Sequence, residues 1–212
     1  MEHYIEVNHI SKEFKGNQVL SDITLCADRG QITGIVGHNG SGKSVLFKIL
    51  TGLMSSDEGE VIADKRKIKY GVYPESLGLI IETPGYIEDL SGFENLKTIA
   101  SIKNKIDKQI IENYMKMFGL DKKNEKPAKK YSLGMKQKLG LIQAFMEDPD
   151  LLILDEPMNA LDKDSTKKVR DLLLEKKAQN KCIIIASHLS DDINILCDKV
   201  YELDGGIATQ IK

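Results

Sequence analysis

The residues that decide the fold are GHNGSGKS at positions 37–44, which follow the apolar segment QITGIV at positions 31–36. Their spacing satisfies the pattern G-x-x-x-x-G-K-[ST] in full. In this pattern glycines let successive backbone N–H groups converge on phosphate oxygens, and a helix beginning near Gly42 points its positive dipole end at them. Lys43 reaches the β and γ phosphates, and Ser44 offers a hydroxyl to Mg²⁺. The stretch therefore predicts a strand, a phosphate-binding loop and a helix, whereas an exposed glycine turn would need neither Lys43 nor Ser44.

The flanks of this loop carry strand and helix patterns in turn. Upstream, β-like segments cover residues 4–10 and 19–26. Downstream, apolar residues recur at helical spacing over residues 45–53, and Gly52 falls where that helix is expected to end. Three more short strands are expected, at residues 59–63, 68–73 and 79–82. These patterns indicate an α/β fold around the phosphate loop.

From residue 93 to residue 146 the apolar periods are helical, which predicts a helical insert subdomain at about residues 84–146. Its middle, residues 103–130, holds nine lysines and four acidic residues, which we interpret as solvated helix faces rather than a docking surface for a partner or lipid headgroups. Beyond the insert, bare apolar runs at residues 151–154 and 182–186 are typical of a parallel sheet covered on both faces. Because we find no repeat and no flexible linker, residues 1–212 are expected to form one domain.

The composition excludes several classes of protein. Hydrophobic residues make up 41% and charged residues 29%, which is typical of a globular chain and not of a disordered one. The formal net charge of −2 gives no overall reason to bind nucleic acid or anionic lipid. The longest apolar run has five residues, whereas a membrane-spanning helix needs about 20. The start MEHYIEVNHI lacks an export signal, and an odd number of cysteines without CxxC favours a reducing, cytoplasmic setting, in which Cys26, Cys182 and Cys197 are expected to be buried.

Polar residues follow both apolar runs, at the edge of the sheet where the phosphate loop is expected. Asp155 and Glu156 end the first run, and His188 follows the second. In an open parallel sheet these strand ends face one ligand crevice, so Asp155 can hold Mg²⁺ while Glu156 acts as general base towards water. His188 can donate to a γ-phosphate oxygen or order the water. Phe14, near the end of the first strand, is either a base-stacking ring or a core residue, and the residues alone leave that choice open.

With these residues in place, the chain resembles the nucleotide-binding subunit of ABC transporters over essentially its whole length. GHNGSGKS resembles that family's Walker A loop, and LLILDEP at residues 151–157 resembles Walker B with its catalytic glutamate. NALD at residues 159–162 is similar to the D-loop, and ASH ending at His188 is similar to the switch histidine. The most specific resemblance is YSLGMKQ at residues 131–137, which is similar to the signature motif and precedes Asp155 at approximately the family's spacing.

This resemblance implies a P-loop NTPase core with a mainly parallel sheet, an N-terminal antiparallel β portion and a helical insert subdomain. It also implies that ATP is sandwiched between two copies of the chain, because the signature helix of one copy grips the γ-phosphate bound to the other. The nucleotide-binding residues implied are Phe14, Gly37, His38, Asn39, Gly40, Ser41, Gly42, Lys43, Ser44 and Val45, with Ser132 and Gly134 facing the partner's ATP. The implied metal ligands are Ser44, Glu82 and Asp155, and the implied catalytic residues are Lys43, Glu156 and His188.

Two departures from the family pattern indicate a branch within it. The usual Leu-Ser-Gly-Gly-Gln becomes YSLGM at residues 131–135, and the loop between core and insert carries Glu82 where glutamine is usual. Glu82 can ligate Mg²⁺ more strongly than an amide but adds negative charge near the γ-phosphate. The alternative is an exposed acid in a loop.

Both departures resemble the bacitracin and lantibiotic self-protection branch. Its members associate with separate membrane subunits and expel peptide antibiotics or detach them from the membrane. The resemblance therefore implies an ATPase at the cytoplasmic face of the cell membrane, bound to a transmembrane permease subunit.

Two other functions remain open at this point. A soluble ABC ATPase acting on nucleic acid or ribosomes would use the same motifs, but the chain has no long heptad coiled coil, no second cassette and a slightly acidic charge balance. A small-molecule kinase would use the phosphate loop but has no need of YSLGMKQ, which without the other motifs would be a plain helix start with Ser132 as N-cap. We therefore expect ATP and Mg²⁺ as ligands and no nucleic-acid partner.

Overall fold

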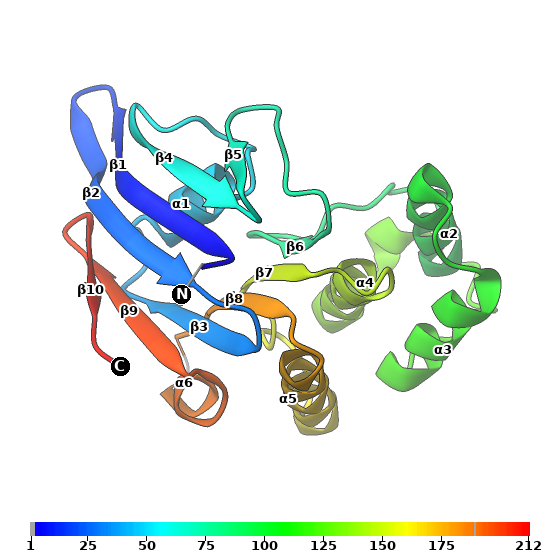
Figure 1. Ribbon diagram of the computed structural model, residues 1–212. Helices are drawn as coiled ribbons and strands as arrows, with labels where there is room; N and C mark the ends of the chain where they lie inside the picture. The colour runs from blue at the N-terminus through cyan, green and yellow to red at the C-terminus, as the bar shows by residue number, and fades with distance from the viewer. Residues whose placement is uncertain (1–2, 189) are drawn as a thin grey trace.

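The computed structural model describes residues 3–188 and 190–212 and contains two β-sheets (Figure 1). The smaller sheet is antiparallel, with the strand order β2-β1-β4-β5. The larger sheet has the order β10-β9-β3-β8-β7-β6, and all its neighbours pair in parallel except β10 and β9. The strands are β1 (Ile5–Phe14), β2 (Asn17–Ala27), β3 (Gln31–Val36), β4 (Glu58–Ala63), β5 (Arg66–Ile68), β6 (Leu77–Ile80), β7 (Leu151–Asp155), β8 (Cys182–Ala186), β9 (Lys199–Asp204) and β10 (Ile207–Gln210). The predicted α/β class, with a mainly parallel sheet and an N-terminal antiparallel portion, is confirmed.

Burial on both faces explains why the central strands read as unbroken apolar runs. In β7, Leu151 and Ile153 belong to the core between the two sheets. Leu152 and Leu154 belong to the core on the opposite face. Because successive residues of a strand point to opposite faces, a strand covered on both sides has no position for a solvated polar side chain.

Helices cover both faces of the larger sheet. α1 (Lys43–Leu50) buries Leu46 and Phe47 in the core between the two sheets. α5 (Lys163–Ala178) and α6 (Ser190–Leu196) cover the opposite face (Figure 1). The larger sheet is therefore the middle layer of the fold. Because the layers cover its faces, a binding site is expected in the segments that follow the ends of its strands.

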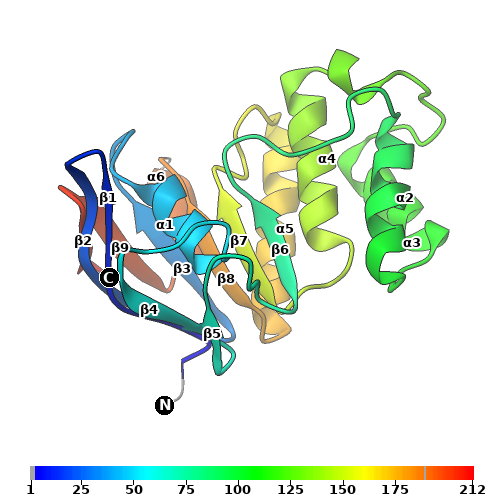
Figure 2. The same ribbon diagram turned by 90° about the horizontal axis from the view of Figure 1, so that it is seen from above.

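The helical insert contains α2 (Gly92–Lys103), α3 (Lys108–Phe118) and α4 (Leu133–Phe145). Of these helices, α4 lies next to β6, the edge strand of the larger sheet (Figure 2). Insert residues such as Phe118 share one apolar core with Leu152 of the sheet. α4 packs against both the insert helices and β6. We propose on this basis that residues 84–146 are a subdomain of one folding unit, with α4 shared between the two parts.

Two predicted strands differ from the structure. The strand expected at residues 68–73 ends at Ile68, because residues 69–72 form a turn in which Gly71 has a φ of 77°. The strand expected at residues 79–82 is β6, which ends at Ile80, so Glu82 lies outside the sheet.

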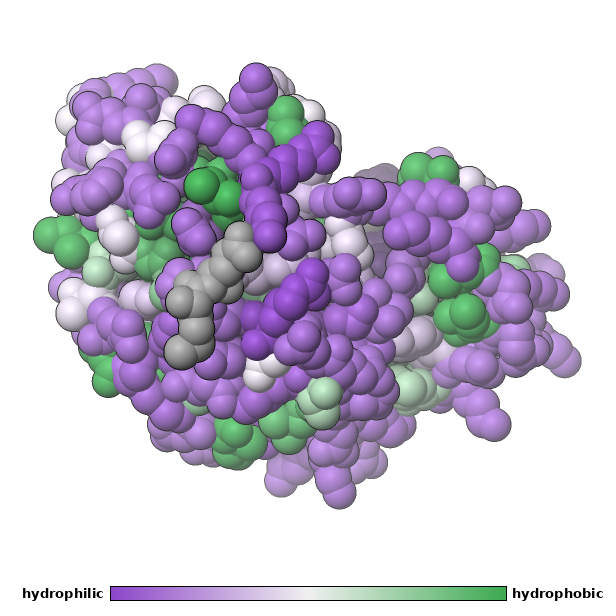
Figure 3. Space-filling view, in the orientation of Figure 1, coloured by the Kyte–Doolittle hydropathy of each residue, from purple (hydrophilic) through white to green (hydrophobic). Residues whose placement is uncertain are grey.

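Hydrophilic side chains dominate the face of the molecule seen in the space-filling view (Figure 3). Apolar side chains form separate small groups on this face. Within the described residues, no helix combines the length and the apolarity needed to cross a membrane. Cys182 and Cys197 are buried as predicted, and burial raises the pKa of each thiol to about 12. The expectation that Cys26 is buried is wrong: it is half-buried, because it lies on the edge strand β2, and its Sγ is 3.2 Å from Lys199 Nζ.

Candidate functional site

The carboxyl ends of three parallel strands bring the predicted site residues to one edge of the larger sheet. β3 runs into the phosphate loop, β7 ends at Asp155, and β8 runs into Ser187 and His188. The strand register places Asp155 of β7 opposite Ala186 of β8, so these two strands end at the same level of the sheet. A hollow of about 310 Å³ opens there, lined by Val19, Asn39, Gly40, Gly42, Lys43, Ser44, Val45, Asp155 and Glu156. The structure thus brings together the phosphate loop and both carboxylates.

Two glycines of the loop are required by the backbone. Gly42, immediately before α1, has a φ of 102°, and a Cβ there would lie 2.9 Å from Leu20 Cδ2. A Cβ on Gly37 would lie 2.3 Å from the carbonyl oxygen of Leu203. Any side chain at either position would displace the loop from the neighbouring strands.

Polar atoms of the loop fit a triphosphate and a hard cation. Lys43 Nζ donates to the carbonyl oxygens of Gly37 at 2.8 Å and His38 at 3.0 Å, so the ammonium lies inside the loop. Ser41 Oγ is buried and has no hydrogen-bond partner among the described residues, which fits a donor that awaits an anion. Ser44 Oγ donates to Asp155 Oδ2 at 2.9 Å, which places a hydroxyl and a carboxylate, both ligands that Mg²⁺ prefers, side by side.

Glu156 and His188 form a pair beside the loop. His188 Nδ1 lies 2.7 Å from Glu156 Oε2. Because an ionised carboxylate only accepts hydrogen bonds, such a contact requires a proton on Nδ1 of the imidazole. Glu156 has a φ of 49°, a left-handed conformation that costs about 1–3 kcal/mol for a residue with a side chain. Its N–H donates to the Ala186 carbonyl at 2.9 Å, so β8 helps to hold this conformation.

A buried ion pair supports the segment that carries His188. Ser187 Oγ donates to Asp192 Oδ2 at 3.3 Å, and Asp192 is fully buried in α6. Arg170 of α5 donates through Nε to Asp192 Oδ1 at 2.8 Å and also contacts it through a terminal nitrogen. The pair therefore joins α5 to α6, and Asp192 also holds Ser187, the residue before His188.

Replacing Arg170 with methionine is expected to lower the free energy of unfolding by about 3–5 kcal/mol, because the Asp192 carboxylate would remain buried without its partner. Denaturant titration followed by circular dichroism measures the change. The double variant Arg170→Met/Asp192→Asn is the control and should recover part of the loss, since the amide carries no charge. A single variant within 1 kcal/mol of the parent protein would show that this pair contributes little.

The signature segment lies at the start of α4. Ser132 is the N-cap, and its Oγ accepts a hydrogen bond from Met135 N at 3.3 Å. Leu133, which stands where the usual motif has its first glycine, is 66% exposed, so its larger side chain points to solvent. A Cβ on Gly134 would lie 2.7 Å from the Ala160 carbonyl oxygen, so this second glycine is needed for α4 to approach residues 159–162. Ser132 and Gly134 do not line the hollow of their own chain.

Three further predicted residues, Phe14, His38 and Glu82, do not line the hollow. Phe14 is 41% exposed, so the alternative of a core phenylalanine is wrong. The hairpin residues Lys15 and Gly16, both with positive φ, hold it at the tip of β1 and β2. Glu82 has a φ of 58° and contacts Lys48 Nζ at 2.6 Å rather than Ser44 or Asp155. His38 is exposed, and its Nδ1 contacts the Asn39 carbonyl at 2.8 Å.

Two residues near the site, Gln137 and Lys138, were not predicted from the residue patterns. Gln137 is buried in α4, and its Nε2 donates to the carbonyl oxygens of Glu156 at 3.2 Å and Pro157 at 3.1 Å. Lys138 Nζ donates to Asp162 Oδ2 at 3.0 Å. The available signal was a glutamine at an otherwise apolar helical position, since buried amides must find partners.

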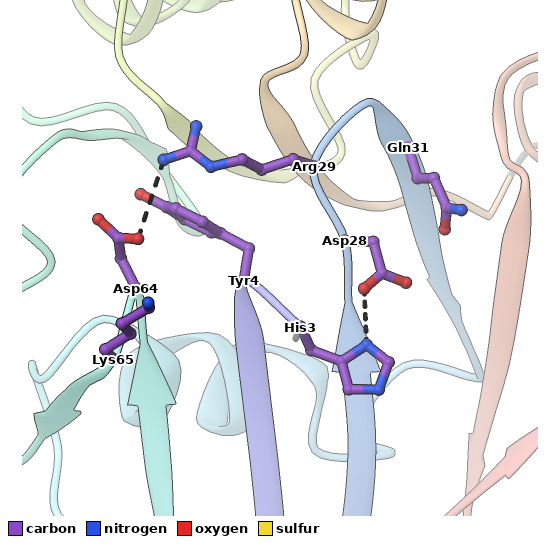
Figure 4. A pocket seen from close by; sticks show the side chains of 7 residues that line it. All are labelled: His3, Tyr4, Asp28, Arg29, Gln31, Asp64 and Lys65. Atoms are coloured by element: carbon purple, nitrogen blue, oxygen red, sulfur yellow. Dashed lines mark hydrogen bonds and ion pairs between the residues drawn. The ribbon is translucent and has the colours of Figure 1, made fainter. Parts of the chain in front are cut away.

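A second hollow, of about 440 Å³, lies at the opposite edge of the larger sheet (Figure 4). Asp28 and Arg29 precede β3, so this hollow is at the amino ends of the parallel strands and away from the phosphate loop. Arg29 lies over the Tyr4 ring at 4.2 Å, and burial raises the pKa of Tyr4 to about 12. His3, Cys26 and Asp28 offer donor atoms within 4.8 Å of one another, but Lys199 Nζ already lies 3.2 Å from Cys26 Sγ and from Asp28 Oδ2. The ammonium neutralises this cluster.

Known proteins share both the sequence and the fold. A sequence profile described as "ABC transporter" matches residues 20–159. The "Uncharacterized ABC transporter ATP-binding protein YybJ" of Bacillus subtilis (strain 168) is 38% identical over 203 residues, which are 95% of this chain and 93% of that protein. The "Bacitracin transport ATP-binding protein BcrA" of Enterococcus faecalis is 35% identical, over 94% of this chain and 66% of its own length. The "Lantibiotic transport ATP-binding protein SrtF" of Streptococcus pyogenes is 31% identical, over 92% of this chain and 84% of its own length.

Solved structures agree with these relatives. A structure described as the ATP-binding subunit of an ABC transporter is 28% identical, with a TM-score of 0.88, and the match covers 98% of this chain and 89% of that one. A dimeric ATP-binding cassette in a post-hydrolysis state, bound to ADP and Pi, has the same TM-score of 0.88 at 20% identity, over 98% of each chain. The second match supports the fold alone.

Proposed function

This chain belongs to the ABC transporter family of ATPases, and we propose that it binds MgATP, pairs with a second copy of itself and hydrolyses the nucleotide to drive a separate membrane subunit. The observation that carries the proposal is the meeting of the phosphate loop, the Ser44–Asp155 pair and the Glu156–His188 pair at one edge of the sheet. A small-molecule kinase would also use the phosphate loop but would not require the signature segment at the start of α4, so measuring whether phosphate is released to water or transferred to an acceptor separates the two functions.

The phosphate loop would hold the triphosphate of ATP. The N–H groups of residues 37–45 and the hydroxyl of Ser41 are donors for phosphate oxygens, and the start of α1 adds its positive dipole end. Lys43 would exchange its contacts with the loop carbonyls for the β and γ phosphates. Phe14 presents an exposed ring on which adenine can stack. Ser44 and Asp155, with Glu82, would hold Mg²⁺, which neutralises charge on the phosphates when bound.

Glu156 would act as the general base. Its carboxylate takes a proton from water as the water oxygen attacks the γ-phosphorus, and the bond between that phosphorus and the β–γ bridging oxygen breaks. A hydrogen bond from His188 Nδ1 would orient the carboxylate. Nε2 would also donate to a γ-phosphate oxygen only when the imidazole carries a proton on both nitrogens. Lys43 balances the negative charge that spreads over the transferring phosphoryl group.

A second copy of the chain would complete each site. Ser132 and Gly134 do not line the phosphate-loop hollow of their own chain. They lie at the start of α4, a helix of 13 residues whose N-terminus can bind an anion. We therefore expect the turnover per molecule to rise with protein concentration. Steady-state ATPase assays over a wide dilution series measure this, and a rate per molecule that does not change with dilution would contradict a shared site.

Relatives named for bacitracin and lantibiotic transport support a proposal for the membrane partner and its cargo. We propose that the chain sits at the cytoplasmic face of the cell membrane and drives the removal of a peptide antibiotic through a permease. Affinity capture of the tagged chain from solubilised membranes, followed by mass spectrometry, tests this. A multi-span membrane protein is expected, whereas ribosomal proteins or nucleic acid would favour a soluble ABC ATPase.

Glu82→Ala is expected to raise the Mg²⁺ concentration for half-maximal ATPase activity about tenfold, because one oxygen ligand is lost. A Mg²⁺ titration at saturating ATP measures it. Lys48→Met is the matched control, since it removes the Lys48 contact but keeps the carboxylate. An unchanged Mg²⁺ dependence in Glu82→Ala would leave Glu82 as an exposed acid paired with Lys48.

A further inference from the structure

Gln137 links the start of α4 to the backbone of Glu156. Both hydrogen atoms of its side-chain amide point at carbonyl oxygens, those of Glu156 at 3.2 Å and Pro157 at 3.1 Å. Gln137 is only 7% exposed, so water does not replace these contacts. The amide therefore fixes two successive carbonyl groups of the loop that follows β7.

That loop is held in a conformation that its own sequence disfavours. Glu156 and Ala160 have φ values of 49° and 59°, in the left-handed region that side chains rarely adopt. Both positions lie against α4: Gln137 contacts the Glu156 carbonyl, and Gly134 lies where a Cβ would be 2.7 Å from the Ala160 carbonyl. Persistent left-handed residues require a surrounding structure that imposes them. Here α4 is the element that contacts both.

α4 has a second contact in the dimer proposed above, because its first turn would face the ATP bound by the partner. The same helix thus touches one nucleotide through Ser132 and holds the base for the other through Gln137. Lys138, which contacts Asp162 at 3.0 Å, adds a third tie between α4 and this loop.

We propose that Gln137 is a positioning residue that sets Glu156 from α4, so that the helix gripping the partner's ATP also holds the base acting on the protein's own ATP. This inference rests on the proposed function. Because Gln137 contacts Glu156 of its own chain, a substitution of Gln137 should lower turnover only when it lies in the same chain as the intact Glu156.

Mixed dimers separate this role from a merely structural one. A trace of protein with an intact Glu156 is mixed with a large excess of Glu156→Gln, so that nearly every active base sits in a mixed dimer. In the first mixture the trace protein carries Gln137→Met; in the second mixture the excess protein carries Gln137→Met together with Glu156→Gln. The reference mixture contains the parent protein and Glu156→Gln alone.

We expect the first mixture to lose about 10- to 100-fold in kcat with the KM for ATP within about twofold, because the base is misplaced while nucleotide contacts remain. The second mixture should keep the turnover of the reference within about twofold. If Gln137 merely supported α4 in gripping the partner's nucleotide, the second mixture would lose activity instead, and that result would overturn the proposal. An unchanged first mixture would overturn it as well.

Two controls keep the result interpretable. Gln143→Met alters the same helix at a glutamine whose Nε2 is buried without a partner among the described residues, and it should leave kcat and the melting temperature near those of the parent protein. Gln137→Glu keeps the shape but removes the amide donors, and in the trace position it should match the loss of Gln137→Met. A reference mixture without ATPase activity would contradict the proposed function itself, independently of Gln137.

Discussion

Glu156→Gln is expected to lower kcat at least about 100-fold while ATP still binds, because the proposed general base is lost but the shape of the side chain is kept. The amide oxygen can still accept the hydrogen bond that His188 Nδ1 directs at Glu156 Oε2, at 2.7 Å in the parent protein. Nucleotide contacts on Lys43 and Ser44 are untouched. Single-turnover hydrolysis of radiolabelled ATP measures the rate, and equilibrium binding of a fluorescent ATP analogue measures affinity.

The same variant should accumulate as an ATP-bound dimer. In the proposed cycle, hydrolysis is the step that separates the two copies, and replacing the carboxylate would lower the negative charge near the γ-phosphate. Size-exclusion chromatography with and without MgATP shows the shift. As a control, Glu147→Gln replaces another glutamate, in the segment after α4, and should behave as the parent protein. Near-normal turnover in Glu156→Gln would exclude Glu156 as the base.

Lys43→Ala is expected to weaken ATP binding about 100-fold, which corresponds to roughly 3 kcal/mol, the upper range for hydrogen bonds made by a charged group. Lys43 Nζ is the cation inside the phosphate loop, held by the carbonyl oxygens of Gly37 and His38. Isothermal titration with ATP in the presence of Mg²⁺ measures the Kd. Lys43→Arg should recover little, because a planar guanidinium does not fit a site built for a compact ammonium.

A matched control separates local from general effects of charge. Lys116→Ala removes an exposed lysine on α3, far from the phosphate loop in sequence and outside the residues that line its hollow. Its Kd for ATP should equal that of the parent protein. A Lys43→Ala variant that binds ATP within threefold of the parent protein would show that the loop holds nucleotide without the lysine, contrary to our proposal.

The altered signature motif has a steric explanation in the structure. Leu133 is 66% exposed in the first turn of α4, so replacing the first glycine of the motif meets no packing constraint in the chain itself. Gly134 is different, because a Cβ there would lie 2.7 Å from the Ala160 carbonyl. The glycine that is retained is therefore the one that lets α4 approach the loop carrying Glu156.

The sequence by itself determined the features that depend on local patterns. The phosphate loop could be read from the spacing in residues 37–44, because only glycines permit its backbone and only Lys43 and Ser44 complete it. The central strands could be read from their unbroken apolar runs, because burial on both faces leaves no polar position. Asp155, Glu156 and His188 could be placed at one edge because parallel strands share the direction in which they end.

Only the tertiary structure decided the contacts that join distant segments. The pairing of Glu82 with Lys48 and the two carbonyl contacts of Gln137 join residues far apart in the chain. The left-handed conformation of Glu156 leaves no mark in the residue type, because glutamate has no preference for it and neighbouring elements impose it. Residue spacing reports which side chains a single element presents, whereas packing between elements decides which atoms those side chains finally meet.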